Sequence, residues 1–325
     1  MVALTTKPEI LQVGSVFPAT QAALDARYVV HRSTPRAPAD GAAANERAEH
    51  LASLGTRIQA VVTNGGSGID TATFDYLPAV KLVACFGVGV DLIDVEGVRA
   101  RGIAVTNTPD VLTEDVADLA LALLLASVRQ VVAADRFVRA GDWLRGPSPL
   151  RGRVHGSRLG IVGMGRIGRA IARRAEGFGM QIAYQGPRAY ADLQYPWFAD
   201  PVALADAVDH LVLACPGGEA TRGLIGAAAL EALGPDGVLV NIARGSVVDE
   251  DALIQALTSG KLGGAGLDVF ADEPQVPEAL IALPQVVLQP HHGSATHATR
   301  QAMGDLVLAN LAAFFAGTPL LTPVR

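Results

Sequence analysis

Apolar stretches of strand length alternate with helix-length segments along most of this chain, first in residues 1–102 and more clearly in residues 159–289. This alternation is typical of α/β proteins, in which helices join the strands of parallel sheets. In the second region each strand is almost continuously apolar, which indicates burial on both faces of the sheet. The strands predicted there are residues 159–162, 181–184, 210–215, 237–242, 264–268 and 286–289.

Two helical regions lie outside this alternation. Residues 107–143 are predicted as one long helical region, with a helix start at Thr113 and two acids in the first turn, where the helix dipole favours negative charge. In this position the region would connect two lobes. Residues 294–316 form a final helical segment with no sheet of its own to cover, so we expect it to return to the first lobe. The first domain is therefore predicted to be discontinuous, residues 1–100 and 292–325, with residues 101–291 inserted as the second domain.

Composition excludes several classes of protein. Half of the residues are hydrophobic and 18% are charged, which excludes a disordered chain. The net charge is -6 and no run of lysines or arginines occurs, so nucleic acid is not an expected partner. The two cysteines, Cys85 and Cys215, form neither a disulfide framework nor a zinc motif, which fits a reducing cytoplasm.

The sequence also predicts a soluble protein. Residues 1–18 lack the basic start, continuous apolar stretch and small-residue cleavage site of a signal peptide. The most apolar run, residues 119–128, is about half as long as the roughly 20 residues that a membrane-spanning helix needs. We therefore expect a cytoplasmic protein without a membrane partner.

A glycine-rich turn gives the sharpest local signal. The stretch LGIVGMGRIG at residues 159–168 places a G-x-G-x-x-G pattern directly after a predicted strand and at the start of a helical segment. In such a turn the first glycine permits the tight bend, the second lets a pyrophosphate approach the backbone, and the third lets the helix pack closely on the strand. The alternative is an ordinary strand-to-helix turn. The cofactor-binding residues predicted in this turn are Gly163, Met164, Gly165, Arg166, Ile167 and Gly168.

The residues after the turn predict which dinucleotide binds. An NAD site places an acid about 20 residues after the turn to bind the ribose 2'-hydroxyl. Residues 177–191 contain no acid; the predicted strand is followed by Gln185 and Arg188, and Arg166 lies inside the turn. Guanidinium groups suit a 2'-phosphate, so we expect NADP to be preferred and NAD to be possible. The alternative reading makes Arg188 a solvated loop residue.

Several further motifs occur in a fixed order along most of the chain. They are GVGVDLID at residues 87–94, NTPDVLTEDVAD at 107–118, NIARGSVVDE at 241–250, GLDVFADEP at 266–274 and PHHGSAT at 290–296. With the glycine turn, they resemble the D-isomer-specific 2-hydroxyacid dehydrogenases and, within them, the glyoxylate/hydroxypyruvate reductase branch. The resemblance implies two Rossmann-like parallel-sheet domains, with the cofactor domain inserted into a discontinuous substrate domain. It also implies an oxidoreductase that reduces a small 2-oxo acid to the D-2-hydroxy acid by hydride transfer from NADPH.

The resemblance assigns catalysis to Arg244, Glu273 and His291, and each of the three lies just beyond a predicted strand. The carboxyl ends of strands in an open α/β sheet border the ligand crevice. Arg244 would hold the substrate carboxylate or keto oxygen with its planar fork of donors. His291 would act as the general acid in reduction, and Glu273 would orient the imidazole and favour its protonated form. Taken singly, the three residues have ordinary alternatives as a surface arginine, a turn carboxylate and a loop histidine.

His292 is a rival to His291, and its role stays open. Successive residues of an extended segment face opposite ways, so only one of the two readily faces the crevice. The family pattern selects His291 and commonly has an aliphatic residue at the position of His292.

Further site residues come mainly from the resemblance. Val88 and Gly89 resemble the loop that receives the substrate carboxylate, and Asn64 belongs to the equivalent substrate loop, with turn chemistry as its alternative. Trp143 resembles an aromatic residue that reaches the substrate cleft of a partner subunit, and burial in an intersubunit core is equally consistent. Asp268 resembles the residue that binds the nicotinamide carboxamide, although a strand-end Asp also caps turns. The remaining cofactor-binding candidates are Thr113, Ala243 and Cys215, of which Cys215 also reads as a small buried apolar residue.

Other functions find less support in the sequence. No nucleophile elbow, metal-ligand cluster or P-loop occurs, so neither a hydrolase nor a metal enzyme is predicted. Two alternatives stay open: a reductase of a bulkier 2-oxo acid such as a phenylpyruvate, and a non-catalytic protein that senses a dinucleotide. The apolar helical region 116–143 and the family resemblance predict a homodimer.

Overall fold

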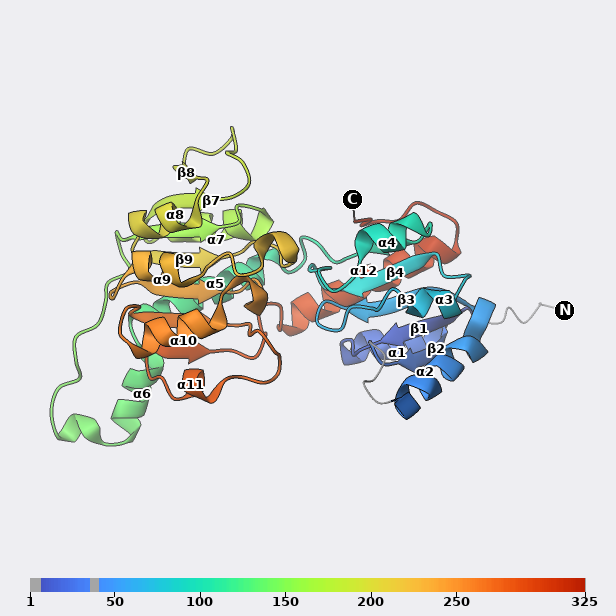
Figure 1. Ribbon diagram of the computed structural model, residues 1–325, viewed down its shortest axis with the longest axis horizontal. Helices are drawn as coiled ribbons and strands as arrows, with labels where there is room; N and C mark the ends of the chain where they lie inside the picture. The colour runs from blue at the N-terminus through green and yellow to red at the C-terminus, as the bar shows by residue number, and fades with distance from the viewer. Residues whose placement is uncertain (1–6, 36–40, 325) are drawn as a thin grey trace. The chain divides into compact units, whose positions relative to one another are not determined.

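Two compact units make up the chain, and the computed structural model describes residues 7–35 and 41–324 of it. Unit 1 consists of Met1–Leu112 and Thr296–Arg325, and unit 2 consists of Thr113–Ala295 (Figure 1). Residues 1–6, the first part of the segment read for a targeting signal, lie outside the described residues.

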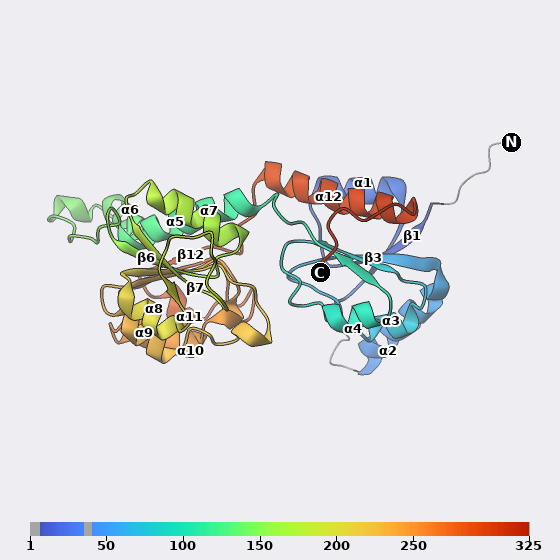
Figure 2. The ribbon, with the colours of Figure 1, turned by 90° about the horizontal axis from the view of Figure 1, so that it is seen from above.

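Unit 1 is built on a five-stranded parallel sheet with the strand order β2-β1-β3-β4-β5. Helices α1 and α12 lie on one face of this sheet, and α2, α3 and α4 lie on the other (Figure 2). The elements are β1 (Glu9–Val13), α1 (Pro18–Arg27), β2 (Val29–Ser33), α2 (Gly41–Leu54), η1 (Gly55–Arg57), β3 (Ile58–Asn64), α3 (Thr73–Tyr76), β4 (Leu82–Phe86), α4 (Val95–Ala100), β5 (Ala104–Thr106) and α12 (His297–Phe315).

Unit 2 is built on a seven-stranded parallel sheet with the strand order β12-β11-β10-β9-β6-β7-β8. Its elements are α5 (Thr113–Val128), α6 (Val131–Arg139), η2 (Asp142–Leu144), β6 (Arg158–Val162), α7 (Arg166–Glu176), β7 (Gln181–Gln185), β8 (Trp197–Phe198), α8 (Pro201–Ala207), β9 (His210–Leu213), η3 (Glu219–Thr221), α9 (Ala227–Leu233), β10 (Val238–Asn241), η4 (Gly245–Val247), α10 (Glu250–Thr258), β11 (Gly264–Leu267), α11 (Glu278–Ile281) and β12 (Val286–Leu288).

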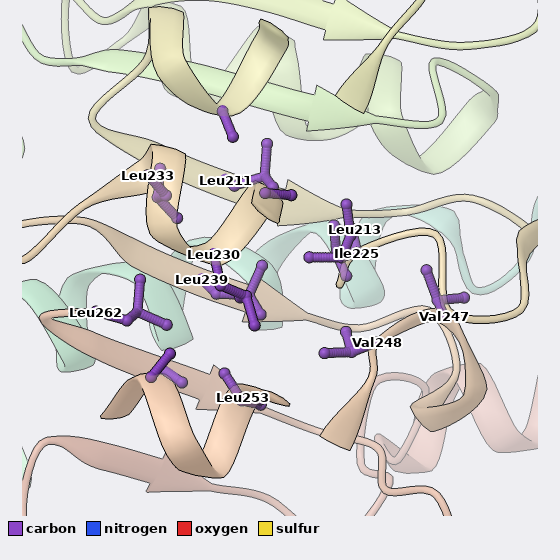
Figure 3. Packing of buried hydrophobic residues seen from close by; sticks show 14 of the residues in the cluster. Leu211, Leu213, Ile225, Leu230, Leu233, Leu239, Val247, Val248, Leu253 and Leu262 are labelled. Carbon is purple, nitrogen blue, oxygen red and sulfur yellow. The ribbon is translucent and has the colours of Figure 1, made fainter. Parts of the chain in front are cut away.

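Helices cover both faces of the unit 2 sheet, as the apolar strands predict. Helices α5 and α7 lie on one face, and α8, α9, α10 and α11 lie on the other (Figure 2). Leucine side chains from β9, β10, α9 and α10, together with Ile225 and Val248 from connecting segments, fill the second of these layers (Figure 3). On the first face α5 packs against β10 and β11. A Cβ atom on Gly266 of β11 would lie 3.0 Å from the Cβ atom of Leu123, so this glycine permits the close approach of α5.

The predicted helical region 107–143 is wrong as a single element. The chain leaves the helix after Val128, and Gln130 adopts a left-handed conformation with φ 47°. A second helix, α6, begins at Val131 and makes an angle of 57° with α5. Within residues 7–35 and 41–324, no single helix is long and apolar enough to cross a membrane, and α5 with α6 passes that test only as a bent pair.

Strand positions in unit 2 follow the prediction, with one addition. All six predicted strands are present, with ends that differ by one or two residues, whereas the short edge strand β8 was not predicted from the sequence. The unit boundaries after Leu112 and Ala295 differ from the predicted ones after residues 100 and 291. The first difference has a physical reason: β5 pairs with β4, and the Thr108 N–H donates to the Gly87 carbonyl, so residues 101–112 complete the first sheet.

The final helix returns to unit 1, as predicted, and a buried asparagine fixes the segment that follows it. Helix α12 packs on α1 and β4. The fully buried Asn310 amide donates to the Leu306 carbonyl and to Thr322 Oγ1, both at 2.9 Å. Asn310 Oδ1 accepts the N–H groups of Leu321 and Thr322, and Thr322 Oγ1 donates to the Asn107 carbonyl at 2.6 Å. One side chain therefore joins α12, the C-terminal segment and the end of β5.

Asn310→Leu should lower the free energy of unfolding of unit 1 by about 2 kcal/mol, because it leaves the N–H groups of Leu321 and Thr322 without their acceptor. Urea unfolding of the full chain measures this loss. The control is Gln301→Ala on the exposed side of α12, where the side chain bonds only Asp305 among the described residues. Equal stability of the two variants would contradict the assigned role of Asn310.

Candidate active site

The strand order of unit 2 reverses between β6 and β9. The chain runs outward from β6 through β7 to β8 in one direction, and from β9 through β10 and β11 to β12 in the other. Ligands of open α/β sheets bind outside the carboxyl ends of the strands at such a switch point. Because all seven strands are parallel, the segments after β6, β9, β10, β11 and β12 emerge at one edge. Most of the site residues predicted in unit 2 lie on these segments, and Gln185 and Arg188 lie at the end of β7 or after it.

The glycine turn has the geometry that a diphosphate needs. Gly163 has φ +95°, and a Cβ atom there would lie 2.5 Å from the backbone nitrogen of Cys215. A Cβ atom on Gly168 would lie 2.1 Å from the Gly163 carbonyl oxygen, so only glycine lets α7 pack this closely on the turn. Gly165 is the N-cap of α7, no side chain caps the helix, and nothing lies within 4 Å of where its Cβ atom would be. The first turn of α7 therefore presents backbone to open space, as phosphate binding requires.

Cys215 lies at the same edge, directly after β9. Burial raises the pKa of its thiol to about 11, so the side chain is a neutral thiol at physiological pH. Its backbone forms one wall of the glycine turn, while the side chain packs against the apolar core of unit 2. Cys215 thus borders the predicted dinucleotide site without a reactive thiolate.

The end of β7 forms a second wall of the turn. The Gln185 carbonyl accepts the Gly163 N–H, and Gln185 Nε2 donates to the Ala199 carbonyl at 3.3 Å. Beyond it, the guanidinium groups of Arg169 and Arg188 lie 5.0 and 5.8 Å from the centre of the Tyr190 ring.

Two members of this group, Arg169 and Asp192, were not predicted from the sequence. Arg169 pairs with Asp192 at 2.6 Å, and this contact lowers the pKa of the carboxyl group. Asp192 stands one position past the acid-free stretch, and its charge is matched by Arg169 rather than by Arg188. The signal that could have found the group is the Arg-x-Tyr-x-Asp spacing at residues 188–192.

Arg244 follows β10 in a turn that Asn241 organises. The buried Asn241 side chain accepts the Ala243 N–H and donates to the Arg244 carbonyl at 2.9 Å. The guanidinium group of Arg244 donates to the Ala243 carbonyl at 2.7 Å. A Cβ atom on Gly245 would lie 2.0 Å from the Phe270 carbonyl carbon, so this turn packs directly on the segment that carries Glu273. Asn241 positions the backbone of the turn that carries Arg244, and this role was not predicted from the sequence.

His291 and Glu273 are joined by a hydrogen bond. Nδ1 of His291 lies 2.7 Å from Oε2 of Glu273, and Oε1 of the same carboxylate accepts the Phe270 N–H at 3.1 Å. Burial alone would raise the pKa of Glu273, but the hydrogen bond to His291 and the charges of His291 and Arg244 outweigh it and lower the pKa below its ordinary value. The three residues predicted as catalytic are thus brought close enough to act on one another.

Asp268 holds the loop that carries His291. Its carbonyl accepts the His291 N–H at 2.8 Å, and its carboxylate oxygens accept the N–H groups of His292 at 2.6 Å and Gly293 at 2.9 Å. His291 itself has φ 54°, a left-handed conformation that needs such support. Burial raises the pKa of Asp268, and the hydrogen bonds from His292 and Gly293 oppose that shift. The predicted contact of Asp268 with nicotinamide is not tested by these bonds and stays a prediction. The side chain of His292 is exposed.

Comparisons with known proteins show which family the chain belongs to. The family described as D-isomer specific 2-hydroxyacid dehydrogenase, NAD binding domain, matches residues 121–293. The chain belongs to this family. It is an NAD(P)-dependent oxidoreductase of the 2-hydroxyacid dehydrogenase class, and the resemblance seen in the sequence is confirmed.

Relatives and solved structures agree with this membership. Glyoxylate/hydroxypyruvate reductase A of Arabidopsis thaliana is 51% identical over 267 residues, which cover 82% of this chain and 85% of the relative. The 2-ketogluconate reductase of Gluconobacter oxydans is 41% identical over 99% of this chain and 100% of its own. The structure of NADPH-dependent glyoxylate/hydroxypyruvate reductase from Sinorhizobium meliloti in complex with NADP and malonate has a TM-score of 0.88 and 43% identity, and the match covers 98% of this chain and 97% of that one.

The substrate-loop candidates of this dehydrogenase lie in unit 1. Asn64 ends β3, and its side chain is engaged in the following turn: Oδ1 accepts the N–H groups of Gly66 and Ser67, and Nδ2 donates to the Ser15 carbonyl at 2.8 Å. These hydrogen bonds stabilise a turn, which is the alternative role named for Asn64 in the sequence. Val88 and Gly89 follow β4, where their carbonyls accept from Asn107 Nδ2 and from the Cys85 thiol.

The other candidates lie in unit 2. Thr113 is the first residue of α5, Ala243 and Met164 are buried at the sheet edge, and Arg166 and Ile167 open α7. Trp143 lies in η2 and is 68% exposed, so it is no core residue of its own chain.

Glu273→Gln should destabilise unit 2 at pH 7 by about 1–2 kcal/mol, because it weakens the bonds to His291 and to the Phe270 N–H. A carboxyl group whose pKa is lowered by folding stabilises the fold above its ordinary pKa of 4.5, and this contribution is lost as the pH falls through the lowered value. The difference in Tm between the wild type and the variant should therefore shrink as the pH falls below 4.5. A difference that stays constant from pH 7 to pH 3.5 or so would contradict the assignment.

Proposed function

We propose that this dehydrogenase reduces a small 2-oxo acid, of the glyoxylate or hydroxypyruvate type, to the D-2-hydroxy acid with NADPH. The observation that carries the proposal is the grouping of Arg244, Glu273 and the Asp268-held His291 at the sheet edge that also carries the glycine turn. The names of the relatives from Arabidopsis thaliana and Sinorhizobium meliloti support the substrate class and the cofactor.

The residues present fit a bound dinucleotide. Gly163, Gly165 and Gly168 form a turn that a Cβ atom would distort or fill, and the first turn of α7 would hold the diphosphate. The end of β7 would hold the adenosine ribose, with Arg188 available to a 2'-phosphate. When bound, the nicotinamide supplies or accepts a hydride.

The chain's own residues would then do the remaining work. Arg244 holds the substrate carboxylate and polarises the keto group, because its planar guanidinium offers paired donors. His291 gives a proton to the keto oxygen as the carbonyl carbon is reduced, and takes it back in the reverse direction. Glu273 accepts the hydrogen bond from Nδ1, which leaves Nε2 of His291 to face the substrate. The carboxylate receptor in unit 1 would be the backbone at Val88 and Gly89.

A second candidate substrate is a bulkier 2-oxo acid. The hydroxyphenylpyruvate reductase of Plectranthus scutellarioides is 48% identical over 85% of this chain, and the match covers 88% of that protein. The two substrate classes differ in the pocket volume they need, and steady-state assays of glyoxylate, hydroxypyruvate and phenylpyruvate with NADPH and NADH separate them. A non-catalytic, dinucleotide-sensing role would require no turnover of any of these acids.

We further propose that the protein works as a homodimer in the cytoplasm. Helix α6 and the segment after it extend away from the unit 2 sheet (Figure 1) and carry exposed apolar side chains. They are Val131, Val132, Val138, Trp143, Leu144 and Leu150, of which Leu144 and Leu150 are at least 95% exposed. A patch of this kind is typical of an interface with a second copy. Both cysteines are free thiols, which suits a reducing compartment.

His291→Gln should lower kcat for reduction by about 10²- to 10⁴-fold, because the proton donor is lost, while the affinity for NADPH changes little. Steady-state kinetics and cofactor fluorescence titration measure the two quantities. His292→Gln is the matched control, since that side chain is exposed and should keep near-normal turnover. Normal turnover of the His291 variant would contradict its proposed role as the proton donor.

Gln185→Asp should shift cofactor preference toward NADH by about tenfold or more, because a carboxylate at the end of β7 repels a 2'-phosphate and accepts a bond from a 2'-hydroxyl. The ratio of kcat/KM for NADPH to that for NADH measures the shift. Gln181→Asp adds the same charge at the other, exposed end of β7 and should leave the ratio unchanged. If both variants behave alike, Gln185 does not border the adenosine ribose.

A further inference from the structure

A pocket lies in unit 2 at the opposite end of the sheet from the glycine turn. Its volume is about 480 Å³, within the range of small-molecule sites. It is lined by Ser157, which precedes β6, by His210, the first residue of β9, and by Val238, the first residue of β10. In a parallel sheet these residues all lie at the amino ends of their strands. The pocket is therefore separate from the active-site edge.

Three polar side chains that line this pocket have buried atoms without a well-formed hydrogen bond. His210 is 4% exposed and Ser127 is 3% exposed, and both line the pocket. Ser127 Oγ and Arg151 Nε make no hydrogen bond within the part of the chain that the structure describes, and the ring nitrogens of His210 make no well-formed one, with only a weak approach to the Arg153 carbonyl. The three residues come from β9, α5 and the segment between η2 and β6. Buried polar groups are seldom left without a partner, so their convergence on one cavity indicates a ligand.

The charges around the pocket favour an anion. Arg151 and Arg153 both line it. The carboxylate of Asp209, which also lines it, is matched by Arg158: the guanidinium donates at 2.5 Å and the backbone N–H at 2.7 Å. The remaining acid, Asp236, is exposed at the rim. The groups left to meet a ligand are thus mostly N–H and O–H donors with positive charge.

We propose that this pocket binds a small organic anion, a carboxylate or a phosphate on a short carbon skeleton, through Ser127, His210 and Arg151. The guanidinium would make the charge-assisted contact, and the serine hydroxyl and one imidazole nitrogen would complete the shell around the oxyanion. The pocket contains none of the residues assigned to the dehydrogenase reaction, so the proposal is independent of that reaction, although Leu150 of the proposed dimer patch lies at the pocket.

Binding should be linked to proton uptake. Burial lowers the pKa of His210, and the neighbouring Asp209 and the Arg153 carbonyl oppose this shift only in part, so the ring is neutral at pH 7 without a ligand. A bound anion favours the imidazolium form, and its affinity should therefore rise as the pH falls. The charged groups that face this region are Asp209 on β9, Arg158 on β6, Asp236 before β10, and Arg151 and Arg153 on the segment before β6.

Isothermal titration calorimetry of the full chain with inorganic phosphate and with malonate tests the proposal. An Arg244→Ala background removes the carboxylate site of the dehydrogenase, and saturating NADP⁺ occupies the glycine turn, so neither competes for the probes. In that background we expect one site per chain for at least one of the two probes, and the tighter probe identifies the preferred oxyanion. Binding should be stronger at pH 6 than at pH 8, by about threefold or more.

Variants of the pocket separate this site from nonspecific binding. Arg151→Ala should weaken binding by about tenfold or more, because the charge-assisted contact is lost. Arg129→Ala is the matched control: it removes an exposed arginine close in sequence that does not line the pocket. His210→Leu, on a strand whose other residues are all apolar, should fold, abolish the pH dependence and raise the Tm of the ligand-free protein.

Two results would overturn the proposal. One is that neither probe binds the Arg244→Ala protein with a Kd below about 10 mM, which would make the cavity a hydrated void only. The other is equal affinity of the Arg151→Ala and Arg129→Ala proteins for the probe. The heat measured in the titration would then come from nonspecific binding to surface charges and not from the pocket.

Discussion

Asp268 ties the end of β11 to the loop that follows β12. Its backbone carbonyl accepts a hydrogen bond from the His291 N–H, and its two carboxylate oxygens accept hydrogen bonds from the N–H groups of His292 and Gly293. Those bonds hold the backbone of His291 in a left-handed conformation and bring its ring to Glu273, whose other oxygen is anchored on the Phe270 N–H. The proposed proton-transfer group therefore lies on a loop that is fixed at three consecutive amides. A catalytic imidazole needs this order, because small displacements of a reacting group cost large factors in rate.

The rest of the sheet edge follows from the same parallel arrangement. Because β6 and β9 are adjacent, the glycine turn after β6 packs against the Cys215 backbone after β9, and the Gln185 carbonyl at the end of β7 closes it from the other side. Asn241 orders the turn that carries Arg244, and Gly245 lets that turn pack on the segment carrying Glu273. Polar side chains buried behind the reacting groups thus set the geometry of the edge. At the other end of the same strands, His210 and Ser127 are buried without such partners, which makes that end the place for a second ligand.

Much of this could be predicted from the sequence, for reasons visible in particular elements. Buried parallel strands are nearly continuous apolar runs, so β6, β9 and β10 were found, whereas the two-residue edge strand β8 has no pattern to read. The break between α5 and α6 depends on the backbone of Gln130, which no helix signal reveals. Motif spacing predicted Arg244, Glu273 and His291 as the catalytic residues, and the structure brings them close together. It did not reveal Asn241 or the Arg169–Asp192 pair, because their roles arise from contacts between segments that are distant in the chain or from side-chain direction.

The central claim is that the loop held by Asp268 presents the His291 imidazole to the keto oxygen of the substrate. A crystal structure of the ternary complex with NADP⁺ and an unreactive 2-oxo acid analogue tests it most directly. The account predicts His291 Nε2 within about 3.2 Å of the analogue's keto oxygen, with Nδ1 still bonded to Glu273. A complex in which the analogue is fully bound but another group, or only water, contacts that oxygen would contradict it.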